Sequence, residues 1–189
     1  MTRQVLYFDK AGTENTAACL ELLPGLVAEG YTDVVVASTT GDTGAAAAAR
    51  LAGLGANLVV VGHSVGFKEP NRDEFIPEHE AAISKAGGKV FRGTILTHSL
   101  ETALAAAHQG LYPTVLIAQT LRRLGQGTKV CCEIVMEACD AGLINEGKHV
   151  VAVAGTARGA DTVAIIGSAA SKRFLDLQVA EFVAKPRRW

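Results

Sequence analysis

The chain has 189 residues, of which 49% are apolar and 20% are charged, and this composition is typical of a folded globular protein. The length suits one domain, residues 1–189, with a full-sized core. The formal net charge is -1, so the sequence lacks the basic surplus that nucleic acid or an anionic membrane attracts. We therefore expect no nucleic-acid partner and no membrane partner.

The N-terminus and the cysteines favour a cytoplasmic location. No apolar run approaches the roughly 20 residues of a transmembrane helix, and the first stretch, MTRQVLYFDK, lacks the apolar region of a signal peptide. The four cysteines form no C-x-x-C pair, and the five histidines form no H-x-H or H-E-x-x-H pair. We expect the cysteines to be small core residues and predict no metal site.

Short β-branched runs alternate along the chain with Ala- and Leu-rich stretches of helical spacing. The expected elements, in chain order, are the strand Val5–Phe8, the helix Thr16–Glu29, the strand Asp33–Ala37, the helix Thr43–Leu54, the strand Leu58–Val61, the helix Glu78–Ala86, the strand Val90–Phe91, the helices Leu100–His108, Pro113–Leu124 and Thr128–Ala141, and the strands Val150–Val153, Val163–Ile166 and 176–184.

These elements predict an α/β domain with three layers, in which helices cover both faces of a sheet. The strand runs are apolar throughout, which is typical of strands buried on both faces of a parallel sheet. The last three runs follow one another after short connections, and such connections suit antiparallel hairpins better than crossovers. We therefore expect a mixed, mainly parallel sheet with antiparallel additions near the end of the chain.

Ligands of open α/β sheets bind outside the carboxyl ends of the parallel strands. This rule selects five segments, which are 11–16, 38–44, 62–67, 92–99 and 155–162. The helix that begins near Thr128 leads back to the strand at Val150, so it should start at the same edge of the sheet. We expect Lys129 near the cleft and Glu133 one turn further in.

The segment 38–44, STTGDTG, is the strongest indication of a ligand site. It joins a buried strand to a helix whose first N–H groups are unpaired and whose dipole favours an anion. The candidate residues here are Ser38, Thr39, Thr40, Gly41, Asp42 and Thr43. The Walker A and G-x-G-x-x-G patterns are absent, and an ordinary capped helix start is the alternative interpretation. Because a carboxylate repels a phosphate, we expect Asp42 to cap the helix or to face a cation or a ligand hydroxyl.

Two further segments could contribute to this edge. The connection GTARGADT is tight, and a hairpin turn explains its glycines without a ligand. Its candidate residues are Gly155, Arg158, Gly159, Asp161 and Thr162. Arg158 could hold a phosphate or lie in solvent. In AGTENT, Glu14 and Asn15 could face the cleft, although capping of the first helix by Thr13 to Thr16 is the simpler interpretation.

Residues 62–66, GHSVG, match the G-x-S-x-G pattern of a serine hydrolase nucleophile elbow, with Ser64 as the nucleophile. That elbow needs a helix directly after the serine, because the helix start helps to build the oxyanion hole. Here the polar, proline-containing stretch FKEPNRDEFIPEH follows, and it predicts no helix before Glu78. We interpret the stretch as a strand end, where Ser64, Gly66 and Phe67 are candidate walls of a binding site.

Several stretches together resemble the C-terminal domain of pyruvate kinase, and more closely a family of small stand-alone proteins with that fold, common in archaea. The resemblance covers nearly the whole chain and lies in YFDKAGTENT, VVASTTGDTG, KVCCEIVMEACDAGLI, VVAVAGTARGADTVAII and VAKPRR. It implies a three-layer α/β/α fold with a mixed, mainly parallel sheet. Members of the family look like flavin mononucleotide (FMN) binders of unassigned activity.

The resemblance also implies which residues bind the ligand. By position, these are Glu14, Asn15, Thr16, the loop 38–43, Lys129, Glu133, Gly155, Arg158, Gly159, Asp161 and Thr162. FMN carries a phosphate that a hydroxyl-rich helix start could hold, and its apolar ring could lie against Phe67. The chain lacks the catalytic barrel of pyruvate kinase, so phosphoryl transfer from phosphoenolpyruvate is not implied.

Three functions therefore stay open at this point. The first is a flavoprotein, such as a flavin-dependent oxidoreductase. The second is a non-catalytic sensor or regulatory domain that binds a phosphorylated metabolite. The third is a hydrolase that uses Ser64. No other general base or nucleophile stands out in the sequence, so the catalytic residues are undefined, and a homo-oligomer is an assembly common among proteins of this size.

Overall fold

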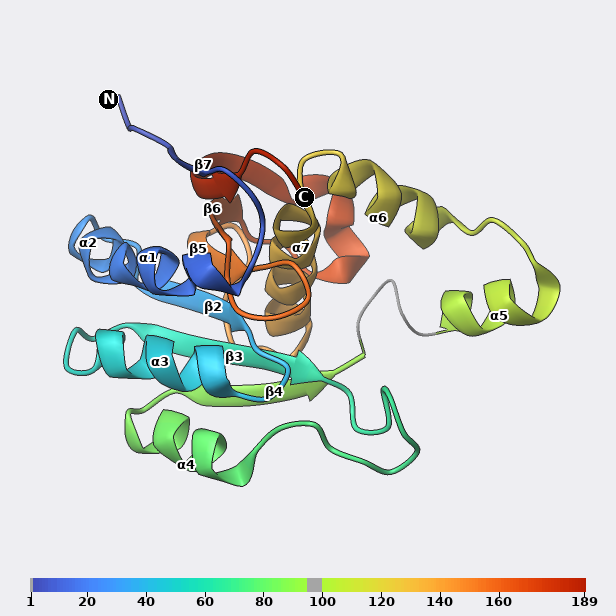
Figure 1. Cartoon of the computed structure of the whole chain (residues 1–189), viewed down its shortest axis with the longest axis horizontal. Coiled ribbons are helices and arrows are strands. Elements are labelled where there is room, and N and C mark those ends of the chain that lie inside the picture. The colour runs from blue at the N-terminus through green and yellow to red at the C-terminus, as the bar shows by residue number, and fades with distance from the viewer. Residues whose placement is uncertain (1, 95–99) are drawn as a thin grey trace.

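A single mixed sheet forms the centre of the molecule (Figure 1). The computed structural model describes residues 2–94 and 100–189. Within these residues the strands are β1 (Leu6–Phe8), β2 (Asp33–Ala37), β3 (Asn57–His63), β4 (Lys89–Gly93), β5 (His149–Ala154), β6 (Thr162–Gly167) and β7 (Gln178–Pro186). The strands expected from the β-branched runs are thus present, each with ends within about three residues of the prediction.

The order of strands across the sheet is β1-β7-β6-β5-β2-β3-β4. Parallel pairing joins β5, β2, β3 and β4, while β6 runs antiparallel to both β5 and β7. The short connections near the end of the chain therefore form antiparallel hairpins, as predicted. Among the described strands, however, β1 has β7 as its single partner and lies at one edge of the sheet, away from β2.

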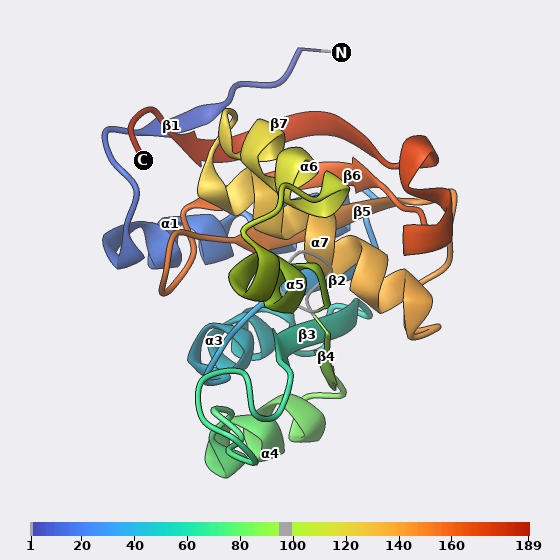
Figure 2. The same ribbon diagram turned by 90° about the vertical axis from the view of Figure 1, so that its right-hand side faces the viewer.

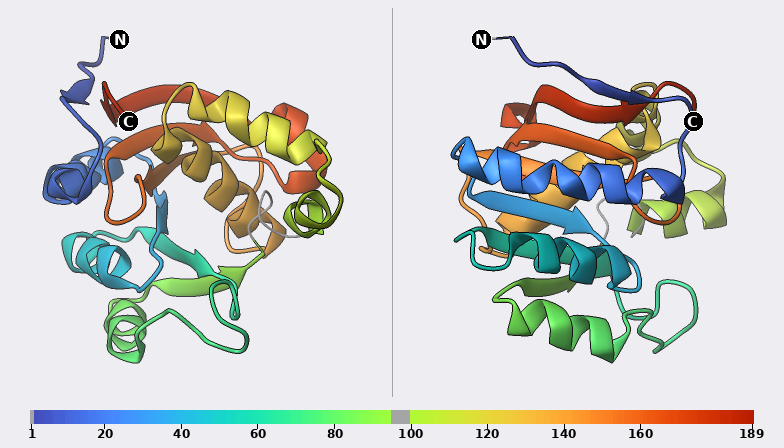
Figure 3. Two further views of the ribbon diagram at one scale, coloured as in Figure 1. Left: turned by 45° about the vertical axis from the view of Figure 1, so that its right-hand side comes forward. Right: turned by 60° about the vertical axis from the view of Figure 1, so that its left-hand side comes forward.

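Helices cover both faces of this sheet (Figure 3). Their bounds are η1 (Thr13–Asn15), α1 (Thr16–Glu21), α2 (Leu23–Ala28), α3 (Asp42–Leu51), α4 (Pro77–Lys85), α5 (Leu100–His108), α6 (Pro113–Arg122), α7 (Gln126–Asp140) and η2 (Ser171–Asp176). One core cluster lies between α1–α4 and the sheet, and the other lies between α7 and the opposite face. The prediction of an α/β fold with a mixed, mostly parallel sheet is confirmed.

Two helical segments depart from the simple layered arrangement. The expected helix Thr16–Glu29 is divided at Leu22, because Pro24 in the next turn has no N–H to continue the hydrogen-bond ladder. The helix α5 has no buried residue and projects from the body of the molecule, whereas α6 packs against α7 (Figures 1 and 2). Among the described helices, none is long and apolar enough to cross a membrane.

The helix α3 packs closely against β3 on one face of the sheet. The buried residues of α3 are Thr43, Gly44, Ala47, Ala48 and Leu51, and their spacing puts small side chains on one helix face. At Gly44, a β-carbon would lie 2.5 Å from Cγ1 of Val60, so only glycine allows this approach. The start of α3 is thereby fixed beside the end of β2.

Replacing Gly44 by alanine should therefore destabilise the fold. The added carbon overfills a packed site, and such overpacking typically costs about 1–3 kcal/mol. Gly25 in α2 is the matched control, because a β-carbon there meets no atom within 4 Å. Thermal unfolding should show a lower melting temperature for Gly44→Ala. For Gly25→Ala it should show an unchanged or higher one, since alanine in a helix is favoured over glycine by roughly 0.5–1 kcal/mol. Equal effects of the two changes would contradict this packing argument.

Candidate functional site

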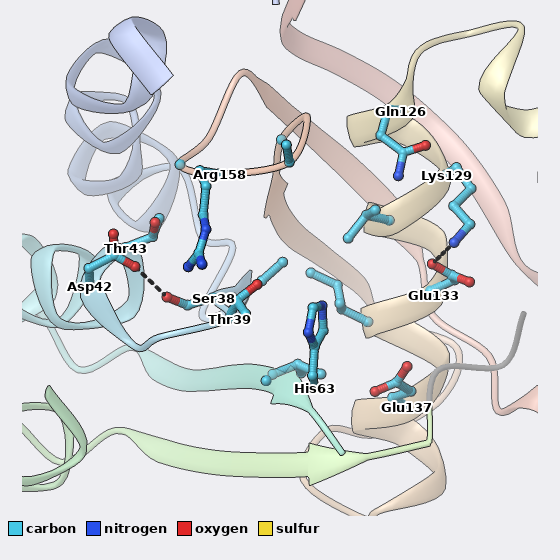
Figure 4. Close-up of a pocket in the computed structure, with 18 of the residues that line it drawn as sticks. Ser38, Thr39, Asp42, Thr43, His63, Gln126, Lys129, Glu133, Glu137 and Arg158 are labelled. Atoms are coloured by element: carbon cyan, nitrogen blue, oxygen red, sulfur yellow. Dashed lines mark hydrogen bonds and ion pairs between the residues drawn. The ribbon is translucent and has the colours of Figure 1, made fainter. Parts of the chain in front are cut away.

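A cavity of about 270 Å³ lies at the edge where β2, β3 and β5 end (Figure 4). Four segments form its walls: the β2–α3 loop, the end of β3, one face of α7, and the β5–β6 loop. The lining residues are Ala37, Ser38, Thr39, Asp42, Thr43, Val61, Gly62, His63, Phe67, Gln126, Lys129, Val130, Glu133, Ile134, Glu137, Gly155, Ala157, Arg158 and Gly159. The cavity thus lies at the carboxyl ends of parallel strands, where open α/β sheets bind ligands.

The helix α7 turns a polar stripe toward the cavity. Gln126, Lys129, Glu133 and Glu137 are spaced by three or four residues, so they share one face of the helix. The face toward the sheet is apolar, and Val135 on it is completely buried. As the direction of the helix predicted, Lys129 and Glu133 both line the cavity.

Lys129 and Glu133 form a buried ion pair one turn apart. The distance from Lys129 Nζ to Glu133 Oε2 is 2.5 Å, and both side chains are almost fully buried. Burial lowers the pKa of the Lys129 ammonium group, and the adjacent Glu133 carboxylate opposes that shift. The pair therefore compensates the desolvation of each partner, although buried pairs of this kind contribute little net stability.

Glu137, one turn beyond Glu133, is the unusual ionisable group of the cavity. Its exposed fraction is 3%, and within residues 2–94 and 100–189 its Oε2 atom has no hydrogen-bond partner. Burial, and then the nearby Glu133 carboxylate, raises the pKa of Glu137 to about 8. The group is therefore a neutral carboxyl at pH 7, with an O–H that can donate to a ligand.

A histidine that the sequence reasoning did not select lies on the opposite wall. His63 ends β3, points into the cavity (Figure 4), and packs its ring against Phe67 at a centroid distance of 4.2 Å. Its Nδ1 atom is 2.9 Å from Oε2 of Glu74. Burial would raise the pKa of Glu74, but hydrogen bonds from His63 and Lys68 outweigh it and lower that pKa. The carboxylate therefore orients the imidazole ring.

The β2–α3 loop brings hydroxyl groups and a helix start to the cavity. Asp42 accepts hydrogen bonds from Ser38 Oγ (3.3 Å) and Thr40 Oγ1 (2.9 Å). Burial alone would raise the pKa of Asp42, but bonds from Thr40, the N–H of Thr43 and Ser38 lower it. Asp42 is the first residue of α3, and these bonds tie its carboxylate to the loop that precedes the helix. Thr39 and Thr43 also line the cavity, and their hydroxyls make no such bond to Asp42.

Arg158 extends from the β5–β6 loop toward the β2–α3 loop (Figure 4). Its guanidinium group makes no hydrogen bond or ion pair with the part of the chain that the structure describes. The loop itself is held by buried Asp161, which accepts hydrogen bonds from the Thr156 N–H (3.0 Å) and from Thr162 Oγ1 (2.8 Å). Thr16 Oγ1 adds a bond from the Ala160 N–H at 2.9 Å. The arginine is thus an unpaired cation on a firmly anchored loop.

The sequence-predicted residues divide into two groups. Those that line the cavity are Ser38, Thr39, Asp42, Thr43, Phe67, Lys129, Glu133, Gly155, Arg158 and Gly159. Those that do not line it are Glu14, Asn15, Thr16, Thr40, Gly41, Ser64, Gly66, Asp161 and Thr162. Residues 95–99 of the expected segment 92–99 lie outside the described residues.

Residues of the second group make other contacts in the structure. Asn15 donates to the carbonyl groups of Lys10 and Gly12, and it thereby shapes the turn before α1. Gly41 precedes α3 with a φ of 88°, where a β-carbon would lie 2.5 Å from the Phe75 ring. Glu14 lies at the surface in an ion pair with Lys10.

The structure lacks the context that a Ser64 nucleophile needs. Turns and bends follow Ser64, and the next helix, α4, begins only at Pro77. Among the described residues, no histidine hydrogen-bonds to the Ser64 side chain, and Ser64 does not line the cavity. The helix start that builds an oxyanion hole after a nucleophile elbow is therefore missing here.

Sequence reasoning missed Gln126, His63 and Glu137. A signal for Glu137 exists, because Lys129, Glu133 and Glu137 recur every four residues in an otherwise apolar helix. For His63 the signal was its position at the carboxyl end of a buried strand. No group of three or more His, Cys, Asp or Glu side chains within residues 2–94 and 100–189 is arranged to hold a metal ion. No protein-family model matches the sequence.

The raised pKa of Glu137 predicts a specific pH dependence of stability. Between its ordinary value of 4.5 and about 8, the folded state keeps a proton that the unfolded state releases. The proton on Glu137 therefore stabilises the folded state. This stabilisation is fully present below pH 4.5 and is lost as the pH rises through 8. The charged groups around it are Lys129, Glu133 and Asp140 on α7, with His63 facing from β3.

Glu137→Gln should weaken that pH dependence, because an amide cannot ionise. Thermal unfolding at pH 5, 7 and 9 should show a smaller fall in melting temperature for the variant than for the wild type. Between pH 5 and pH 9, the free energy of unfolding should fall by a few kcal/mol less in the variant than in the wild type, since each pKa unit corresponds to about 1.4 kcal/mol. Glu78→Gln, at an exposed position of α4, is the control and should follow the wild type. Parallel curves for Glu137→Gln and the wild type would refute the assignment.

Proposed function

We propose that this cavity binds a phosphate-bearing small molecule, with the phosphate between Arg158 and the β2–α3 loop. The observation that supports this most is the Arg158 guanidinium group, which points at the start of α3 and has no partner in the described part of the chain (Figure 4). A planar guanidinium matches phosphate geometry, and a helix start adds N–H donors and a favourable dipole. Thr39 and Thr43 supply hydroxyl donors at the same end of the cavity.

FMN is the specific candidate, because the chemical groups that line the cavity match those of its phosphate, its ribityl chain and its ring. Arg158 and the threonine hydroxyls suit the phosphate, and the polar face of α7 suits the ribityl hydroxyl groups. Val61, Val130 and Ile134 supply an apolar wall for the ring. A bound flavin would supply hydride or single-electron chemistry, so that an FMN-dependent oxidoreductase is the corresponding activity.

A flavin site predicts a coloured protein. Purified protein, or protein incubated with FMN and then desalted, should absorb near about 450 nm. Arg158→Gln should weaken FMN binding tenfold to a hundredfold, because a hydrogen bond to a charged group contributes about 1.5–3 kcal/mol. Arg123→Gln is the control, since Arg123 is exposed and lies outside the cavity. Fluorescence titration of FMN measures both affinities, and equal losses in the two variants would contradict the assigned phosphate position.

The size of the cavity favours a second candidate, a sensor or regulatory domain for a compact phosphorylated metabolite. At about 270 Å³ the cavity lies just below the range of roughly 300–1,000 Å³ that is usual for ligand pockets. A sugar phosphate fits within that space, whereas the ring of FMN would extend beyond it.

This second candidate predicts thermal stabilisation by sugar phosphates. A ligand at a hundred times its dissociation constant stabilises the folded state by about 2.7 kcal/mol, which raises the melting temperature by several degrees. Melting curves with sugar phosphates, the unphosphorylated sugars and FMN would separate the two candidates. Stabilisation by the unphosphorylated sugars equal to that by their phosphates would argue against a phosphate site of either kind.

A further inference from the structure

Two groups that phosphate binding does not use face each other across the cavity. His63 comes from the end of β3, and Glu137 comes from α7 (Figure 4). Glu74 accepts a hydrogen bond from Nδ1 of His63 at 2.9 Å, so Nδ1 carries the proton of the neutral ring. Nε2 is then the ring nitrogen with a lone pair, and it can accept a proton as a general base.

Glu137 has the properties of a general acid. Its side chain is 97% buried, it lines the cavity, and its Oε2 atom has no partner among the described residues. The other carboxyl groups of the lining are engaged, because Asp42 accepts hydrogen bonds from Ser38 and Thr40 and Glu133 pairs with Lys129. A buried carboxyl group without a partner is costly unless it is neutral or a ligand completes its bonding.

We propose that this cavity catalyses proton transfer on a phosphorylated α-hydroxy aldehyde or ketone, with His63 as the base and Glu137 as the acid. The proposal rests on the phosphate site at Arg158. The phosphate at that end would place the carbon chain of the substrate along the cavity between the two groups. Phe67 and Glu74 act as positioning residues, because they hold the His63 ring and its tautomer.

The reaction needs no oxidant, reductant or metal ion. Nε2 of His63 takes the proton from the hydroxyl-bearing carbon as that C–H bond breaks, and Glu137 gives its O–H proton to the carbonyl oxygen. The product of this step is an enediol, with His63 as imidazolium and Glu137 as carboxylate. The imidazolium then protonates the former carbonyl carbon, and the carboxylate takes the proton of the other hydroxyl group. Aldose and ketose interconvert, and both side chains return to their starting states.

Proton exchange with solvent tests this proposal on the full-length protein. Ribose 5-phosphate, glucose 6-phosphate and dihydroxyacetone phosphate would each be incubated with the protein in D₂O and followed by proton NMR. We expect deuterium at the carbon next to the carbonyl group, above the protein-free rate, for at least one of the three. His63→Gln and Glu137→Gln should each lower the exchange rate by about 10²–10⁴-fold. Glu74→Gln should lower kcat with little change in KM, since the Glu74 carboxylate orients the His63 ring and does not contact the substrate.

Controls separate loss of chemistry from loss of folding or of binding. Glu78→Gln on α4 should keep the wild-type exchange rate, and melting curves should show that every variant is folded. Because Glu137 must be protonated, wild-type exchange should fall as the pH rises above about 8. Stabilisation by the phosphates without exchange would overturn the proton transfer alone. If no phosphate, including FMN, stabilises the protein, the proposed phosphate site fails as well.

Discussion

The whole site depends on burial of the apolar face of α7 against the sheet. Cys131, Val135 and Ala138 are completely buried in the cluster beneath this helix. Rotation of the helix about its axis would bring these side chains into water, and each would lose on the order of 1–3 kcal/mol of burial free energy. The rotation is therefore fixed, and the remaining face, with Lys129, Glu133 and Glu137, must point into the cavity. Burial of the apolar face of α7 thus determines the direction in which its polar face points.

This placement puts ionisable groups of α7 in a poorly solvated space, which destabilises their charged forms. Two features of the structure offset this desolvation. Lys129 and Glu133 neutralise each other at 2.5 Å. Glu137 has no such partner and keeps its proton instead, so its pKa rises to about 8. The opposite end of the cavity carries Arg158, a cation that no side chain of residues 2–94 and 100–189 pairs with. The cavity therefore carries a cationic guanidinium group near α3 and a buried carboxyl group on α7.

The loops around the cavity are held by side chains that never reach it. Asp161 closes the β5–β6 turn, and Thr16 ties that turn to α1. The resemblance implies that both residues bind the ligand, and in the structure both hold the backbone that carries Arg158. A sequence shows that Thr16 is polar, but not which N–H group it meets.

The sequence by itself determined the kind and order of the elements, because hydrophobic periodicity is a local property. The run Asp33–Ala37 forms the expected strand, and STTGDTG joins that strand to the expected helix. Only the tertiary structure decided which strands are neighbours, and it put β1 at the sheet edge and left Glu14 outside the lining of the cavity. It also decided the environment of His63 and Glu137, because burial and hydrogen bonding depend on segments that are distant in the chain. The chemistry of these two groups therefore arises from packing, which no local pattern encodes.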